Sequence, residues 1–305
     1  MVDEESGRFI YSFMVFGASI HGYALMRKIV AVDGMHFFAY CVVDKENDAS
    51  WGFFFEKLKA FIVDEPELCV IVDRYVSIAK GPARYYPLVH HGICMRYLDE
   101  NLRTNHHCSN SLYLYYHAAK AYMLEEFKDY FNALKERCPK AAACLEHEVG
   151  FEKWIRVHFL GNRFNIMTSN IFESLNSMLH DEREYSVSTI FNSIAHRFGE
   201  IFRKRYAEVD NLKTTFIPVT EVILRENMTE GDKLYVNNIN GSTNKFTVLS
   251  YDRSAKVNLS RWSCSCRKYN LVKLPCVHAM AALRLKHGDE YDTNIYNYSS
   301  QIYSK

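Results

Sequence analysis

The residues with the most specific chemistry are three cysteines and one histidine near the C-terminus. They form two close pairs, Cys264-Ser265-Cys266 and Cys276-Val277-His278, separated by the short loop 267–275. Zinc prefers a tetrahedron of thiolate and imidazole ligands, and a set of three cysteines and one histidine leaves no position open for a substrate. The spacing therefore predicts a structural zinc site at Cys264, Cys266, Cys276 and His278. The alternative is that these residues lie close together by chance, without a metal.

Three acidic residues form a second candidate site. Asp33 and Asp73 each follow an apolar run, and Glu173 lies in the first turn of a helix expected to begin at Ser169-Asn170. Three converging carboxylates can bridge two hard cations, as phosphoryl-transfer nucleases require. The alternative is that the aspartates are ordinary turn or cap residues at strand ends.

The elements that would position these acids alternate between strands and helices. Strands are expected at 28–33, 37–43, 68–73 and 88–94, and helices at 49–63 and 78–86. In the first of these helices the large apolar residues recur at helical spacing and form one face: Trp51, Phe54, Phe55, Leu58 and Ile62. This order of elements predicts an α/β core.

Beyond residue 97 the sequence pattern is first helical and then alternating. Residues 98–144 are helical in pattern, and helical character returns from 169 to about 205. Alternating stretches at 233–237 and 245–249, with the turn signal Asn240-Gly241 between them, predict a β-hairpin that leads into the cysteine cluster. Pro275 is expected in the first turn of the helix that follows the cluster.

The bulk composition excludes several function classes. The net charge of the 305 residues is +1, so any nucleic-acid contact must come from a local patch. No apolar stretch is long enough to span a bilayer, and the acidic start, Met1-Val2-Asp3-Glu4-Glu5, does not have the order of a signal peptide. Nine cysteines without secretory features indicate a reducing compartment.

The C-terminal cluster resembles the SWIM zinc finger, whose pattern is C-x-C, a variable loop and C-x-H. The flanking residues Trp262, Leu274-Pro275 and Ala279 also fit that family. The resemblance implies a zinc module that contacts DNA or a protein partner.

Segments along the rest of the chain resemble the Mutator-like (MULE) transposases, in the same order. These segments are Phe16-Gly17-Ala18-Ser19-Ile20-His21-Gly22-Tyr23, Val32-Asp33-Gly34-Met35-His36, 43–51, Ile71-Val72-Asp73-Arg74, His90-His91-Gly92-Ile93-Cys94 and 168–176. The resemblance implies an RNase H-like DDE core with a helical insertion, in which Asp33, Asp73 and Glu173 bind Mg²⁺ and DNA strands are cut and joined. It also implies a nuclear location.

The chain departs from this family at the first acid. Only 34–43 separates Asp33 from Asp44, where the family has a longer antiparallel region, so we expect an RNase H-like core that lacks one strand. Without that strand, 28–33 and 37–43 should either form an antiparallel hairpin or leave a gap in the sheet. The family's DNA-recognition region before the core is not found either. We therefore expect a degenerate or domesticated transposase that binds zinc; the alternatives are an active Mg²⁺-dependent transposase or nuclease and a transcriptional regulator.

The resemblance also sets the expected domain boundaries. A partial core is expected at 1–97, a helical insertion at 98–164, core-completing helices with Glu173 at 165–210, and a β-hairpin with the zinc finger at 211–305.

Two further groups of residues have weaker signals. The family's C-x-x-H reads Cys94-Met95-Arg96-Tyr97 here, so Cys94 is expected to be a small buried hydrophobe. His106-His107-Cys108 could supply other ligands, although the histidine pair is expected to be a solvated helix or loop face. Basic residues that could meet phosphate are Arg197, Arg203, Lys204, Arg205, Lys268 and Lys273, although so short a charge run is more often a solvated face.

Overall fold

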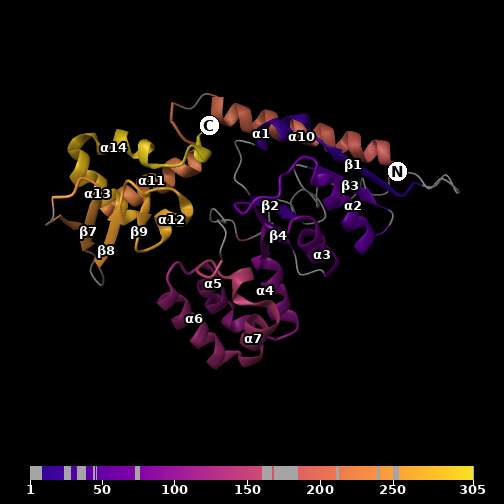
Figure 1. The fold of residues 1–305 in the computed structure, drawn as a ribbon, viewed down its shortest axis with the longest axis horizontal. Helices are drawn as coiled ribbons and strands as arrows, with labels where there is room; N and C mark the ends of the chain where they lie inside the picture. Colours follow the sequence, from indigo (N-terminus) through magenta and orange to yellow (C-terminus); the bar gives the residue numbers. More distant parts are fainter. Residues whose placement is uncertain are drawn as a thin grey trace. The chain divides into compact units, whose positions relative to one another are not determined.

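A computed structural model describes the chain over 9–23, 29–32, 39–43, 45, 47–72, 76–159, 167, 185–210, 213–238, 241–249 and 254–304. The chain divides into two compact units, 1–203 and 204–305, and each is described by itself (Figure 1). Among the described residues, no helix is both long enough and apolar enough to cross a lipid bilayer.

The N-terminal unit contains two small sheets. The first pairs β1 (Tyr11–Val15) with β3 (Ala39–Val43) in antiparallel orientation. The second consists of β2 (Ile29–Val32), β4 (Cys69–Val72) and β5 (His90–Ile93), all parallel, in the order β2-β4-β5. The strands expected around 28–33, 37–43, 68–73 and 88–94 are therefore confirmed, and the mixed α/β class is confirmed with them.

The antiparallel hairpin expected between 28–33 and 37–43 is wrong. The other expectation, a gap in the sheet, stays a prediction. In the described residues β2 and β3 belong to different sheets. The reason is a partner that the sequence reasoning missed. Strand β1 pairs along the full length of β3, from Tyr11 opposite Val43 to Val15 opposite Ala39.

Helix α2 (Asp48–Leu58) packs on these strands. It begins at a capping box, in which the Asn47 side chain accepts from the backbone N–H of Ser50 and the Ser50 hydroxyl accepts from that of Asn47. The aromatic and aliphatic face predicted for this segment is buried, and Phe55 at its centre has no exposed surface. Its partner is α3 (Val76–Tyr85), which comes so close at Gly81 that a Cβ there would overlap the ring of Phe55.

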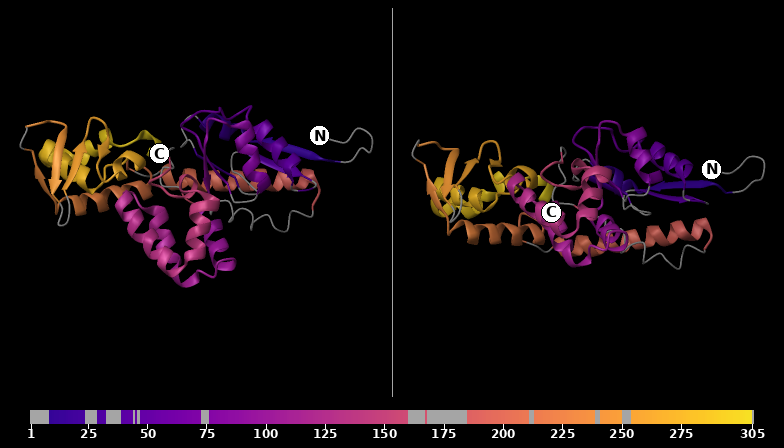
Figure 2. Two further views of the ribbon diagram at one scale, coloured as in Figure 1. Left: turned by 60° about the horizontal axis from the view of Figure 1, so that its bottom comes forward. Right: turned by 90° about the horizontal axis from the view of Figure 1, so that it is seen from below.

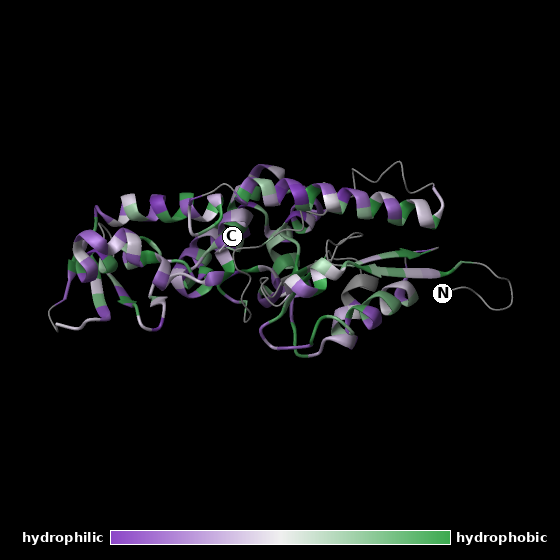
Figure 3. Ribbon diagram, turned by 90° about the horizontal axis from the view of Figure 1, so that it is seen from above, coloured by the Kyte–Doolittle hydropathy of each residue, from purple (hydrophilic) through white to green (hydrophobic). Residues whose placement is uncertain are grey.

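A long helix, α10 (Val187–Asp210), runs across the boundary between the two units. Its hydrophilic and hydrophobic residues alternate around the axis (Figure 3). The apolar stripe contacts the β1–β3 sheet: Ile194 is buried with Tyr40, and the ring of Phe198 stacks on that of Phe16 with centroids 4.1 Å apart.

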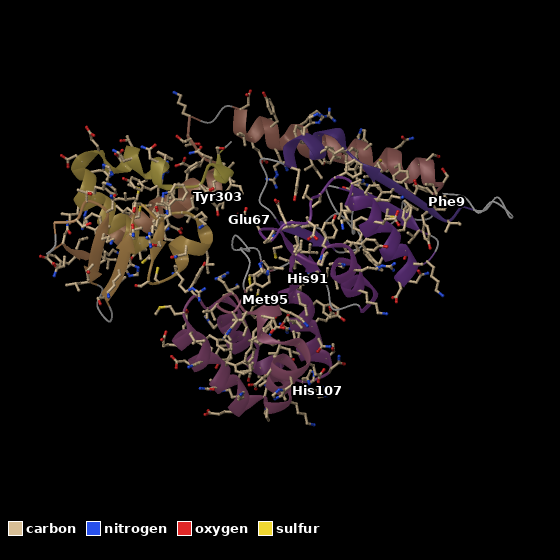
Figure 4. The ribbon with its side chains drawn as sticks, viewed as in Figure 1. Phe9, Glu67, His91, Met95, His107 and Tyr303 are labelled. Atoms are coloured by element: carbon tan, nitrogen blue, oxygen red, sulfur yellow. The ribbon has the colours of Figure 1, made fainter. Side chains whose placement is uncertain are left out.

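A helical cluster follows β5. Its α-helices are α4 (Met95–Thr104), α5 (Leu112–Lys120), α6 (Leu124–Arg137), α7 (Pro139–Ala143) and α8 (Phe151–Trp154). Tyr115 and Trp154 are buried at its centre, and their polar atoms are satisfied by backbone carbonyls: the hydroxyl of Tyr115 donates to Met95 (2.9 Å) and the indole of Trp154 to Leu145 (3.2 Å). Figure 4 shows Met95 where the chain passes from β5 into these helices.

The C-terminal unit packs helices against an antiparallel sheet. The strands β6 (Tyr235–Asn237), β7 (Lys245–Leu249), β8 (Ser254–Asn258) and β9 (Ser263–Cys264) form a meander in that order. The helices are α11 (Pro218–Gly231), α12 (Lys268–Val272), α13 (Val277–His287) and α14 (Tyr291–Asn294). The predicted hairpin is confirmed by the pairing of Tyr235 with Leu249, while β8 and β9 extend the sheet beyond the prediction.

Helix α13 packs on β6, β7 and β8 and on α11, with its middle turns buried (Figures 1 and 2). Tyr303 links α12 to the residue that precedes α11. The hydroxyl of Tyr303 donates to the carbonyl of Val272 (2.6 Å), and the carbonyl of Tyr303 accepts from the N–H of Ile217 (3.1 Å).

Candidate metal centre

Two tight turns present the cysteine and histidine side chains. Cys264 ends strand β9, and its carbonyl accepts from the N–H of Arg267 (2.9 Å), which closes a turn around Cys266. This turn needs a left-handed backbone at Arg267, with φ of 63°. The second pair lies at the start of α13, where Cys276 is the N-cap and His278 is in the first turn. The predicted helix is confirmed, but Pro275 precedes the N-cap instead of lying inside the first turn.

The four side chains converge on one point. Their candidate ligand atoms all lie within 4.8 Å of one another: the Sγ atoms of Cys264, Cys266 and Cys276 and a ring nitrogen of His278. Sγ of Cys266 is 3.5 Å from Sγ of Cys276, and Sγ of Cys264 is 3.7 Å from Nδ1 of His278. With Zn–S near 2.3 Å and Zn–N near 2.0–2.1 Å, an ideal tetrahedron has S···S edges of about 3.8 Å and S···N edges of about 3.6 Å. The donor set and these two edges therefore fit a tetrahedral zinc ion.

Hydrogen bonds among the three thiols shift their pKa values in opposite directions. Cys264 and Cys276 are buried, and Cys266 and His278 are half-buried. Hydrogen bonds from the thiols of Cys264 and Cys276 lower the pKa of Cys266 far below its ordinary value. The bond to Cys266 raises the pKa of Cys264 to about 12, and bonds to the other two thiols raise that of Cys276. A divalent cation can take the place of these thiol protons, because zinc binds cysteines as thiolates and releases protons.

A layer of hydrogen bonds outside the cluster orients the ligand-bearing backbone. The amide oxygen of Asn270, in α12, accepts from the N–H of Cys264 (2.9 Å). The amide nitrogen of Asn227, in α11, donates to the carbonyl of Pro275 (2.9 Å), directly before Cys276. Sequence reasoning missed both residues. Asn270 carries a weak signal as a polar residue between the cysteine pairs, whereas Asn227 lies too far along the chain to give one.

The structure does not describe the predicted acidic residues. Asp33, Asp73 and Glu173 all lie outside the described residues, as does the helix start expected at 169–170. Cys94 is buried with Cys69, Ile71 and Phe159, in agreement with its interpretation as a small hydrophobe. His107 lies in the helical cluster, after the end of α4 (Figure 4).

Two of the basic residues on α10 make local contacts. Nε of Arg203 donates to the carbonyl of Gly199 (3.2 Å), and Arg205 pairs with Glu208 (3.0 Å). Sequence reasoning missed a larger basic segment, 241–277, which holds seven lysines and arginines and a single acidic residue. A charge count in a moving window would have found it.

Comparison with known proteins agrees with the geometry of this centre. Curated proteins and solved structures give no match to the chain. Residues 251–287, which contain all four clustered ligands, match the SWIM zinc finger.

Proposed function

We propose that Cys264, Cys266, Cys276 and His278 bind one structural Zn²⁺ and that this ion holds the C-terminal unit together. The observation that carries the proposal is the convergence of four donor atoms within 4.8 Å in a segment that matches a zinc finger. Three thiolates and one imidazole leave no open position, so the role is structural and not catalytic.

The elements around the site explain why a metal is needed there. Strand β9 has two residues and α12 has five, and elements this short are not stable by themselves. The ligands come from two places in the chain: Cys264 and Cys266 lie at and just after the end of β9, and Cys276 and His278 lie at the start of α13. A bound ion would tie the end of the sheet to the buried helix and close the loop 267–275.

The experiment is a measurement of zinc content with matched cysteine variants. Purified wild type should hold about one zinc per chain, as a single Cys₃His site requires. Cys266→Ser should lose most of it, whereas Cys41→Ser should keep it, because Cys41 is equally half-buried but lies on β3. Wild-type protein without metal but with an ordered C-terminal unit would refute the zinc proposal.

We further propose that the N-terminal unit derives from a MULE transposase, with an RNase H-like core that lacks one strand and a helical insertion at 98–164. The parallel strands support this. Val32 and Val72, which precede Asp33 and Asp73, are register partners in β2 and β4. Neighbouring strands lie about 4.8 Å apart, so β2 and β4, which precede the two aspartates in the sequence, end at the same edge of one sheet. The origin would imply a nuclear protein with a DNA or protein partner.

Loss of activity is part of this proposal, and a nicking assay tests it. We expect no Asp73-dependent nicking or strand transfer with Mg²⁺ or Mn²⁺, because the proposed core lacks the strand that follows Asp33 in the family, and catalysis tolerates only about 0.5 Å of looseness. The comparison is wild type against Asp73→Ala, with Asp129→Ala, an exposed acid on α6, as control. Nicking that Asp73→Ala abolishes and Asp129→Ala retains would favour the active alternative.

A further inference from the structure

The outward face of the C-terminal sheet carries an open groove of about 970 Å³. All four strands contribute to it, and so does the first ligand-bearing turn. Its outward-facing lining includes Lys245 and Thr247 of β7, Lys256 and Asn258 of β8, Ser263 of β9 and Ser265.

Strand alternation produces this face. Along β7 and β8 the residues Phe246, Val248, Ala255 and Val257 are buried against the helices, so their neighbours must point outward. The register places Lys245 opposite Asn258 and Thr247 opposite Lys256. The two lysines are therefore diagonal neighbours on one face, roughly 7–8 Å apart at the backbone.

The charge of the groove has one sign. Among the described residues, its lining contains Lys245 and Lys256 and no carboxylate, and both lysines are exposed. Within the described residues neither ammonium group forms an ion pair. The groove lies within the basic segment 241–277, whose one acid, Asp252, is outside the described residues. A field of this kind attracts anions to a chain whose net charge is close to zero.

The polar groups between the lysines are suited to phosphate. Hydroxyls and amides of Ser, Thr and Asn, together with lysines, are the side chains that contact phosphate oxygens in nucleic-acid complexes. The one aromatic residue in the described lining, Phe246, is buried and cannot stack with a base. The groove therefore suits contacts with the nucleic-acid backbone better than stacking with the bases.

We propose that this groove binds the phosphodiester backbone of a nucleic acid. The proposal rests on the proposed zinc site in one respect: Cys264 lies in the groove wall, so the ion would fix the strand that completes the groove.

The test is anisotropy of labelled 20-nucleotide probes titrated with the full chain: single-stranded DNA, single-stranded RNA and duplex DNA. Binding is measured over a range of salt concentrations for wild type, Lys245→Gln/Lys256→Gln and a matched double variant, Lys213→Gln/Lys233→Gln. The control lysines are exposed and lie in the same unit outside the groove.

Each phosphate contact contributes about 0.7 for a single strand, or about 0.9 for B-DNA, to the slope of log K against log salt. The groove variant should therefore flatten the slope by about 1.4 or about 1.8 and weaken binding, while the control variant should keep the wild-type slope. Comparing the three probes identifies which nucleic acid supplies the backbone.

Three results would overturn the proposal: no binding of any probe by wild type, the same slope in the groove variant as in wild type, or displacement of the probe by polyglutamate at equal charge concentration. Zinc content measured on the same samples separates the two proposals. A zinc-free wild type whose binding still depends on Lys245 and Lys256 refutes the metal site and supports the groove.

Discussion

Helix α11 ends against α13 at a glycine, and this contact gives the sharpest prediction for the stability of the zinc module. A Cβ on Gly231 would lie 2.8 Å from the carbonyl oxygen of Val277, 2.8 Å from Cβ of Met280 and 3.2 Å from the backbone nitrogen of Ala281. All three atoms belong to the backbone or to the first side-chain atom of α13, so no rotamer change can move them away. The substitution Gly231→Ala must therefore push α13, which carries two of the four candidate ligands.

Two opposing energies decide the result. Alanine in place of glycine favours a helix by up to about 1 kcal/mol, and less at a helix end such as this one. Forcing an extra carbon into a packed interface costs about 1–3 kcal/mol, and the upper part of this range fits a site whose neighbours are backbone atoms. We expect Gly231→Ala to destabilise the C-terminal unit by about 1–2 kcal/mol, equivalent to a fall in Tm of about 4–8 °C per kcal/mol for a unit of this size.

The matched control is Gly199→Ala. Gly199 lies in the helix α10, and a Cβ there meets no described atom within 4 Å, so only the gain in helix propensity remains. It should leave the module unchanged or stabilise α10 by about 0.5–1 kcal/mol. The assay is hydrogen exchange of the α13 amides, read peptide by peptide, together with the temperature of zinc release. Protection of α13 in Gly231→Ala equal to that in wild type would refute the packing argument.

Three other substitutions test separate parts of the fold. Gly81→Ala should destabilise the N-terminal unit by about 1–3 kcal/mol in urea unfolding, because the new Cβ would overlap the buried Phe55 ring. The control is Gly52→Ala on the facing helix, which should be tolerated because its Cβ would meet only a hydroxyl at 3.7 Å. Burial lowers the pKa of His91, so below about pH 6.5 the unfolded chain binds more protons than the folded one. The free energy of unfolding should therefore decrease as the pH is lowered through that range. His91→Gln should flatten this dependence in urea midpoints measured from about pH 5 to 8. Tyr303→Phe removes a hydroxyl that donates to a backbone carbonyl at 2.6 Å. It should lower the Tm of the C-terminal unit by an amount equivalent to about 1 kcal/mol. An unchanged Tm would show that water replaces this hydrogen bond.

The elements that could be predicted from the sequence are those with strong local patterns. The segment 68–73 is a continuous apolar run, and all four residues of β4 are buried. The segment 49–63 repeats large apolar residues at helical spacing; four of them form the buried face of α2, and Ile62 is buried just beyond its end. In both cases the burial that stabilises the element is visible in the order of its own residues.

Pairing between distant strands could not be read in this way. Strand β3 was predicted, but its partner β1 lies 24 residues away at the nearest register pair, Val15 with Ala39, and its short run YSFMV gives little signal of its own. The error about the hairpin followed from this omission, because the edge of β3 was assumed to have no other partner. Strands β8 and β9 were missed for a similar reason. Strand β9 has only two residues, and it is recognised as a strand because it pairs with Val257 and Asn258.

The same distinction explains why the metal ligands could be predicted and the groove could not. The four ligands lie within 15 residues, and their types and spacing are nearly the whole requirement for zinc, since the chain only has to fold back once. The groove needs Lys245 and Lys256 on one face, which depends on the register of β7 with β8 and on the attachment of β9. The relation between the strands that precede Asp33 and Asp73 in the sequence is of the second kind, because only the pairing of Val32 with Val72 shows that β2 and β4 end side by side. A site whose residues are neighbours in the sequence can be recognised from their types, whereas a site assembled by strand register requires the pairing to be known first.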